Sequence, residues 1–239
     1  MLHDVRFPGE SDAYRQARDD LLQAELELRR RIEAVAAQRR ALPAGGEVPT
    51  DYVFDEWDAD VGAVRRVRLS ELFEDGKNQL FIYSFMFRPG ARGAPLEVPC
   101  PVCTSIIDAI DGAVPHIEQH INCAVVTKAP IERFGAHARA RGWRNVRLLS
   151  SADTSFNSDY RIEAADEEQF AMATTFVRRN GKIHHVWSSE LWFVPAEPGQ
   201  NPRHVDFMWP MWSILDRTPE GRGSGWMPQL RYSSAPVRS

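Results

Sequence analysis

Two cysteines, Cys100 and Cys103, lie three residues apart, and residues 104–111 after them have the composition of a helix. About one helical turn separates the two side chains, so their sulfurs can approach closely enough to form a disulfide. Pro101 suits the first turn of that helix, where its missing N–H would have had no partner. The unpaired N–H groups and the positive end of the helix dipole stabilise a thiolate on the first cysteine. The pattern predicts a redox pair in which Cys100 attacks and Cys103 resolves.

Two other interpretations of the pair stay open from the residues alone. Both cysteines could pack as small apolar groups in a core, which would make the protein a redox-silent binding protein or scaffold. A metal site is the other interpretation, because four residues have the spacing of a C2H2 zinc finger: Cys100, Cys103, His116 and His120.

Three features of the sequence count against zinc. Ile107 and Ala113 stand where a finger needs a large aromatic residue and a leucine, and Pro115 precedes the first histidine inside the finger's helix. If residues 103–120 form one helix, the cysteines and His116 lie about 20 Å apart along its axis and cannot share a metal. We therefore expect neither a metal nor another cofactor.

Composition limits the classes of partner. The 239 residues fit one large domain, or one domain with appendages. A net charge of −4, with 26% charged residues, gives no electrostatic reason to expect nucleic-acid binding. No apolar run reaches the roughly eighteen residues of a membrane span, and no apolar signal segment is visible at the N-terminus. We expect a cytoplasmic protein without a membrane partner, in a compartment that keeps thiols reduced.

The N-terminal region is predicted to form one long helix over residues 11–41, capped by Ser11 and ended by residues 43–46. Apolar residues at seven-residue spacing form a narrow stripe along it: Tyr14, Leu21, Leu28 and Val35. Such a stripe fits either docking on the protein's own domain or a homodimer formed through the helix. We expect an N-terminal helical extension over 1–46, a domain over 47–194 and a C-terminal tail over 195–239 that packs on the domain.

The remaining chain alternates between strands and helices. Short strands are expected at residues 52–54, 64–69, 80–87, 121–127, 145–150, 170–178 and 182–187, with helices at 103–120, 131–141 and 210–215. Asn180-Gly181 between the last two strands is a strong hairpin signal. Cys123 falls in the middle of an apolar strand and reads as a core thiol. This order predicts an α/β fold in which a mixed sheet is flanked by helices and Cys100 follows the end of a central strand.

The order of strand, C-x-x-C helix, strand, helix and hairpin resembles the thioredoxin fold. Residues 69–73, 80–83 and 148–150 are more similar to its peroxiredoxin branch. Most of the chain resembles a bacterial family of unknown function whose thioredoxin-like members are described as predicted dithiol-disulfide oxidoreductases. The matching stretches lie between residues 11 and 223, at 27–40, 99–105, 111–116, 128–133 and 215–222.

This resemblance implies a thiol-disulfide oxidoreductase that acts on a thiol or disulfide substrate through Cys100 and Cys103. A thiol peroxidase is a further alternative, implied by the peroxiredoxin-like stretches. Thioredoxins carry a cis-proline opposite their cysteines, before the strand that corresponds to residues 170–178. No proline occurs here between Pro130 and Pro195, so we expect a narrower substrate range than that of thioredoxin.

Overall fold

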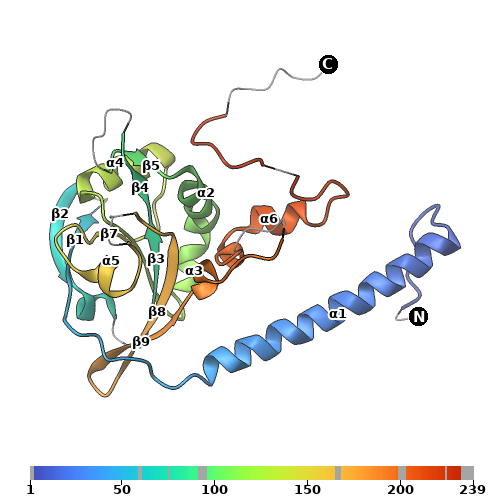
Figure 1. The fold of residues 1–239 in the computed structure, drawn as a ribbon, viewed down its shortest axis with the longest axis horizontal. Coiled ribbons are helices and arrows are strands. Elements are labelled where there is room, and N and C mark those ends of the chain that lie inside the picture. The colour runs from blue at the N-terminus through green and yellow to red at the C-terminus, as the bar shows by residue number, and fades with distance from the viewer. Residues whose placement is uncertain are drawn as a thin grey trace. The chain divides into compact units, whose positions relative to one another are not determined.

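The computed structural model describes residues 3–58, 61–74, 76–90, 96–164, 168–198, 203–223 and 225–232. The chain divides into two compact units, Met1–Ala44 and Gly45–Ser239. Figure 1 labels the elements of both units.

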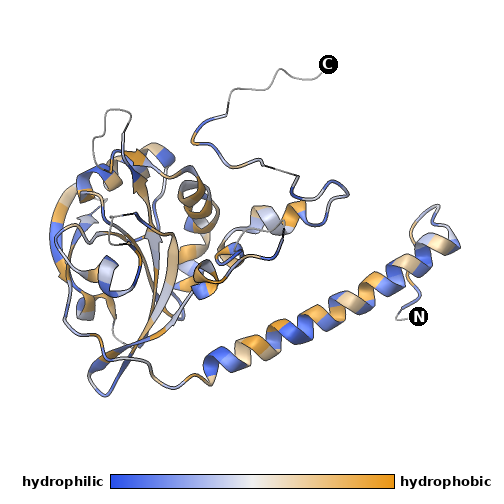
Figure 2. Cartoon of the chain, viewed as in Figure 1, coloured by the Kyte–Doolittle hydropathy of each residue, from blue (hydrophilic) through white to orange (hydrophobic). Residues whose placement is uncertain are grey.

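The first unit is built around α1, which spans Asp12–Arg40 and agrees with the predicted helix to within one residue at each end. The Ser11 side chain accepts a hydrogen bond from the N–H of Tyr14, which satisfies one of the donors that a helix start leaves unpaired. Basic side chains in the last turn complement the helix dipole. The helix alternates between hydrophilic and hydrophobic residues along its length (Figure 2). Four apolar side chains of α1 are 55–60% exposed: Tyr14, Leu21, Leu28 and Ile32.

The second unit contains a mixed sheet. Within the described ranges it has seven strands in the order β2-β1-β7-β6-β3-β8-β9. Their bounds are β1 Val53–Asp58, β2 Ala63–Arg68, β3 Gln79–Phe85, β6 Asn122–Thr127, β7 Leu148–Ser150, β8 Met172–Arg179 and β9 Lys182–Ser188. Strands β3, β6 and β7 run parallel, whereas β8 is antiparallel to β3 and β9 is antiparallel to β8. At the other edge β1 pairs antiparallel with both β7 and β2.

Helices connect the parallel strands, as parallel pairing requires. α2 (Pro101–Ile110) and α3 (Val114–Ile117) lie between β3 and β6, and α4 (Ile131–Arg141) lies between β6 and β7. The four strands β6-β3-β8-β9 therefore form a parallel strand–helix–strand unit extended by an antiparallel hairpin. That is the thioredoxin-like arrangement expected from the sequence, and the α/β fold class is confirmed.

The two faces of the sheet carry separate cores, because strand side chains alternate between faces. Tyr83 and Phe85 of β3 point into a core shared with α2 and α4. Leu80 and Ile82 point into a second core, which α5 (Phe156–Asp159) and the 3₁₀ turn Leu69–Leu72 cover. Helical segments thus flank both faces of the sheet.

The turns predicted from the sequence lie at their predicted positions. Gly142 ends α4 in the left-handed conformation, with φ +79°. Asn180 and Gly181 have φ +52° and +76°, as a two-residue hairpin turn of the primed type requires, and they join β8 to β9. In the tail, α6 (Pro210–Leu215) spans the residues predicted for it.

One predicted helix is wrong. Residues 103–120 do not form a single helix, because α2 ends at Ile110, a 3₁₀ turn covers Asp111–Ala113, and α3 follows. The Asp111 carboxylate accepts hydrogen bonds from the N–H groups of Arg144, Asn145 and Val146 at 2.9–3.2 Å. This anchor ties the end of α2 to the loop before β7. The axial separation of about 20 Å used against a zinc site therefore does not apply.

Candidate active site

A pair of short strands brings Cys100 to the end of β3. β4 (Phe87–Arg88) pairs antiparallel with β5 (Val98–Pro99), and the N–H of Cys100 then donates to the carbonyl of Met86 at 3.0 Å. The side-chain amide of Gln169 bonds both the N–H and the carbonyl of Phe87, which fixes β4 in place. The long loop between the strand and the cysteines therefore returns to the strand end, where reactive groups gather in open α/β sheets.

Cys100 is the N-cap residue of α2, with extended backbone angles and Pro101 in the first helical position. Cys103 lies one turn further along the helix. All three cysteines of the chain are free thiols, and neither Cys100 nor Cys103 exposes any surface (0% each). The two predicted cysteines thus lie at the start of a helix, and both are buried.

The two thiols differ in acidity. The pKa of Cys100 is lowered to about 6, chiefly by the hydrogen bond from the Cys103 side chain. The backbone N–H groups of Cys103 and Val102 and the charge of Arg88 lower it further, against the opposing effect of burial. Burial raises the pKa of Cys103 well above its usual value, and the neighbouring Cys100 adds to this shift. Near neutral pH the outer sulfur is a thiolate and the inner one a thiol.

Arg88 is the cation beside the Cys100 thiolate. Its Nη2 atom lies 3.9 Å from the sulfur of Cys100, and its side chain is otherwise exposed. A positive charge at this distance favours the ionised form of the thiol, in agreement with the lowered pKa of Cys100. Arg88 was not identified from the sequence. The signal available was its place as the first charged residue after the apolar strand.

Tyr83 of β3 lies next to the inner cysteine. Its side chain is fully buried, and within the described residues its hydroxyl makes no hydrogen bond of normal geometry. Burial raises the pKa of Tyr83 well above its usual value, and the nearby Cys103 sulfur adds to this. In turn, the hydroxyl acts to lower the pKa of Cys103. A neutral donor is therefore positioned where negative charge would form on the resolving thiol.

A second pair of side chains stabilises the start of α2. The Thr104 hydroxyl donates to the carbonyl of Cys100 at 2.8 Å, and Nε2 of His137 lies 3.0 Å from the same hydroxyl oxygen. Because the hydroxyl proton is already used, Nε2 of His137 is the donor in this contact. Burial, followed by the charge of Arg141, lowers the pKa of His137 to about 4, so the ring is neutral near pH 7. His137 was not identified from the sequence.

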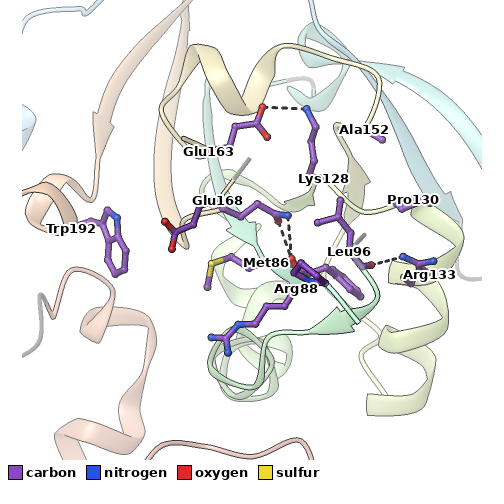
Figure 3. A pocket seen from close by; sticks show the side chains of 13 residues that line it. Met86, Arg88, Leu96, Lys128, Pro130, Arg133, Ala152, Glu163, Glu168 and Trp192 are labelled. Carbon is purple, nitrogen blue, oxygen red and sulfur yellow. Dashed lines mark hydrogen bonds and ion pairs between the residues drawn. The ribbon is translucent and has the colours of Figure 1, made fainter. Parts of the chain in front are cut away.

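Figure 3 shows a pocket of about 970 Å³, and two of the residues that line it, Met86 and Arg88, contact Cys100. Its walls combine apolar side chains, such as Met86, Leu96 and Trp192, with charged ones. Lys128 is paired with Glu163 at 3.3 Å. Arg88 lines the same pocket and contacts the Cys100 sulfur, so it connects the pocket with the reactive pair.

The C-terminal tail packs on α2, the helix that carries the cysteines. Val205, Met208, Trp209 and Trp212 belong to the same buried cluster as Cys100 and Cys103. Nε2 of His204 lies 2.7 Å from the carbonyl of Ala171, the residue that directly precedes β8. No peptide bond within the described residues is cis. The residues directly before β8 therefore keep trans peptide bonds, and His204 of the tail bonds the backbone there.

The other candidate residues lie apart from this site. Cys123 is buried in β6, and burial, with a smaller effect of Glu118, raises its pKa to about 12. In the part of the chain that the structure describes, no group of three or more His, Cys, Asp and Glu side chains is placed to hold a metal ion. The described helices include none with the length and apolar character needed to cross a membrane.

Solved structures similar to this chain include peroxiredoxins. Enterococcus faecalis AhpC is 11% identical, with a TM-score of 0.46, covering 77% of this chain and 98% of its own. A reduced Plasmodium vivax 2-Cys peroxiredoxin is 20% identical, with a TM-score of 0.46, covering 72% and 96%. Peroxidoxin BcpB from Mycobacterium tuberculosis is 16% identical, with a TM-score of 0.42, covering 73% and 98%. The fold assignment rests on the strand order and directions given above.

Among curated proteins, none matches this sequence. A family match covers residues 5–234, which include most of both units, the cysteine pair and most of the tail. The chain belongs to the family described as bacterial protein of unknown function, DUF899.

Proposed function

We propose that the protein is a dithiol-disulfide oxidoreductase that uses Cys100 and Cys103. One observation supports this most strongly: the two thiols lie on one helical turn, and their pKa values are shifted in opposite directions. A purely structural pair of cysteines gains nothing from a stabilised thiolate. A nucleophile needs one, and its partner must stay protonated until the second step.

The reaction has two balanced steps. The Cys100 thiolate attacks one sulfur of a substrate disulfide, so a mixed disulfide forms and the other substrate sulfur leaves as a thiolate. Cys103 then loses its proton to the departing sulfur and attacks Cys100. An intramolecular disulfide forms, and the second substrate sulfur leaves as a thiolate that takes a proton from water. The protein has given two electrons and one proton to the substrate, and a cytoplasmic thiol reductant would restore the reduced pair.

Redox titration in glutathione buffers, followed by thiol labelling, tests this proposal. We expect a single two-electron couple that disappears in Cys100→Ser and in Cys103→Ser. Cys103→Ser should also trap a covalent adduct with substrate through Cys100. Cys123→Ala is the matched control, because Cys123 is buried in β6 away from the pair, and it should leave the couple intact. If Cys100→Ser and wild type behave alike in every exchange and peroxide assay, the protein is a redox-silent scaffold instead.

A thiol peroxidase is the second candidate, favoured by the complete burial of the Cys100 sulfur. A peroxide is small enough to reach a sulfur that a folded protein substrate cannot touch. The thiolate would take the distal peroxide oxygen to give a sulfenic acid and, after proton uptake, an alcohol or water. Cys103 would then condense with the sulfenic acid and release water. Consumption of hydrogen peroxide in single-turnover experiments distinguishes this chemistry from disulfide exchange.

A further inference from the structure

The burial of the cysteine pair restricts how a substrate can arrive. Cys100 has no exposed surface, and the tail residues Met208, Trp209 and Trp212 belong to the same buried cluster. The Arg88 side chain both contacts its sulfur and lines the pocket. A long arginine side chain can change rotamer without disturbing the backbone around it. The pocket side of Arg88 is therefore the approach to the sulfur that needs least rearrangement.

The pocket has the size and composition of a small-molecule site. Its volume of about 970 Å³ matches the clefts that hold drug-sized ligands, and its walls are largely apolar. Among the described lining residues, three are cationic and two are anionic: Arg88, Lys128 and Arg133 against Glu163 and Glu168. Lys128 and Glu163 neutralise each other in an ion pair. The positive charge nearest to the reactive sulfur is that of Arg88.

The Cys100 thiolate does not neutralise the positive charge of Arg88 at every step of the reaction. When Cys100 becomes part of a mixed disulfide, the negative charge beside the guanidinium is lost. A carboxylate on the substrate would replace it, because guanidinium and carboxylate groups form strong paired hydrogen bonds. The site therefore favours a substrate that brings its own negative charge close to its sulfur–sulfur bond.

We propose that this pocket binds low-molecular-weight disulfides that carry carboxylates, with one carboxylate on Arg88 and the sulfur–sulfur bond at Cys100. The inference rests on the proposed disulfide exchange and names its substrate class. The apolar walls accommodate the body of the molecule. The reaction is the two-step exchange given above, and its products are two small carboxylate thiols.

Three symmetric disulfides of similar length test the role of charge in the full-length protein. Dithiodipropionate carries two negative charges, hydroxyethyl disulfide is neutral, and cystamine carries two positive charges. Single-turnover rate constants are measured at about pH 8 and divided by the thiolate fraction, which is read from ultraviolet absorbance. We expect the anionic disulfide to react about tenfold faster than the neutral one, and the cationic one to react slowest.

Arg88→Gln should remove most of this preference, so that the rates per thiolate with the anionic and the neutral disulfide come within about twofold of each other. Arg66→Gln is the matched control, because it deletes the same charge from the exposed strand β2, outside the pocket lining. Thiodipropionate has both carboxylates but no sulfur–sulfur bond. It should compete with the anionic disulfide in wild type and not in Arg88→Gln.

Two results would overturn the inference while leaving the redox function in place. One is an order of rates that is the same with and without Arg88. The other is faster reaction with the disulfides of insulin than with dithiodipropionate. If no disulfide of any charge oxidises the wild-type pair, the proposed function itself fails, and the pocket proposal fails with it.

Discussion

Nη2 of Arg88 and Sγ of Cys100 lie 3.9 Å apart, so an exposed side chain on a short strand influences the ionisation of a fully buried thiol. The charge of Arg88 acts together with the Cys103 hydrogen bond and the helix-start N–H groups. These contributions can be separated by substitution.

The first prediction concerns the pH dependence of Cys100. Its lowered pKa means that the thiolate predominates above about pH 6, so the alkylation rate should rise through that pH and level off by about pH 8. Arg88→Gln removes a stabilising positive charge, so the midpoint should move to higher pH. Iodoacetamide labelling read by peptide mass analysis measures both curves. Identical midpoints in the two proteins would exclude an electrostatic role for Arg88.

The second prediction separates the hydrogen bond of Cys103 from its redox role. Cys103→Ala removes the largest contribution to the lowered pKa of Cys100, so the midpoint should rise. Cys103→Ser keeps a donor at the same place and should keep most of the shift. Both variants lack the resolving thiol and should accumulate the mixed disulfide. If alanine and serine give the same midpoint, backbone N–H groups and Arg88 determine the acidity of Cys100.

The third prediction concerns Tyr83, which is buried without a hydrogen bond of normal geometry in the described structure. Tyr83→Phe removes an unsatisfied hydroxyl, so the free energy of unfolding should stay within about 1 kcal/mol of wild type. The same substitution removes the donor beside Cys103, so release of the mixed disulfide should slow severalfold. The alkylation midpoint of Cys100 should stay unchanged. A slower first step with an unchanged second step would contradict this assignment.

The fourth prediction tests the packing of α4 against the sheet. A Cβ atom on Gly135 would lie 2.5–2.8 Å from the indole ring of Trp57, which is closer than real contacts allow. Gly135→Ala should therefore destabilise the protein by about 1–3 kcal/mol in urea unfolding. Gly112→Ala is the matched control, because a Cβ there meets no atom within 4 Å. Equal midpoints for the two variants would mean that Trp57 moves aside at little cost.

The fifth prediction concerns association through α1. We expect a homodimer formed along its apolar stripe, which leaves Leu28 60% exposed in the helix. Leu28→Glu should shift the mass in solution toward the monomer. Gln23→Glu is the control, because it adds the same negative charge away from the stripe. Gln23 lies about 200° around the helix from Leu21, another residue of the stripe, so the dimer should stay intact. Sedimentation of wild type as a monomer at micromolar concentration would end this idea.

Local signals predicted much of the fold. Some signals depend only on residues close by in the sequence, and they lie at their predicted positions. They are the Ser11 cap, the helix end at Gly142 and the Asn180-Gly181 turn. The helix break at Asp111 was missed because its carboxylate bonds backbone groups more than thirty residues away. Such a contact has no counterpart in hydrophobic periodicity.

The candidate site shows the same division. Cys100 and Cys103 could be read from their spacing and the proline between them. Arg88 had only the weak signal of being the first charged residue after an apolar strand, and His137 had none, because each reaches the site only after the sheet has formed. His137 contacts Thr104 across 33 residues of sequence. In the sequence, Tyr83 is one more residue of a buried strand. Its hydroxyl has a role only because the fold places it next to Cys103.

The hydrogen bond from His204 to the carbonyl of Ala171 has a consequence for recognition. Extended peptides commonly bind by adding a strand, and for this they need free backbone groups beside the site. The carbonyl of Ala171, directly before β8, already has its donor, and the tail that supplies this donor belongs to the same buried cluster as the cysteines. A polypeptide would have to displace the imidazole before it could pair with the backbone here. Selectivity at these cysteines would then come from the charge and shape of a molecule and not from its backbone.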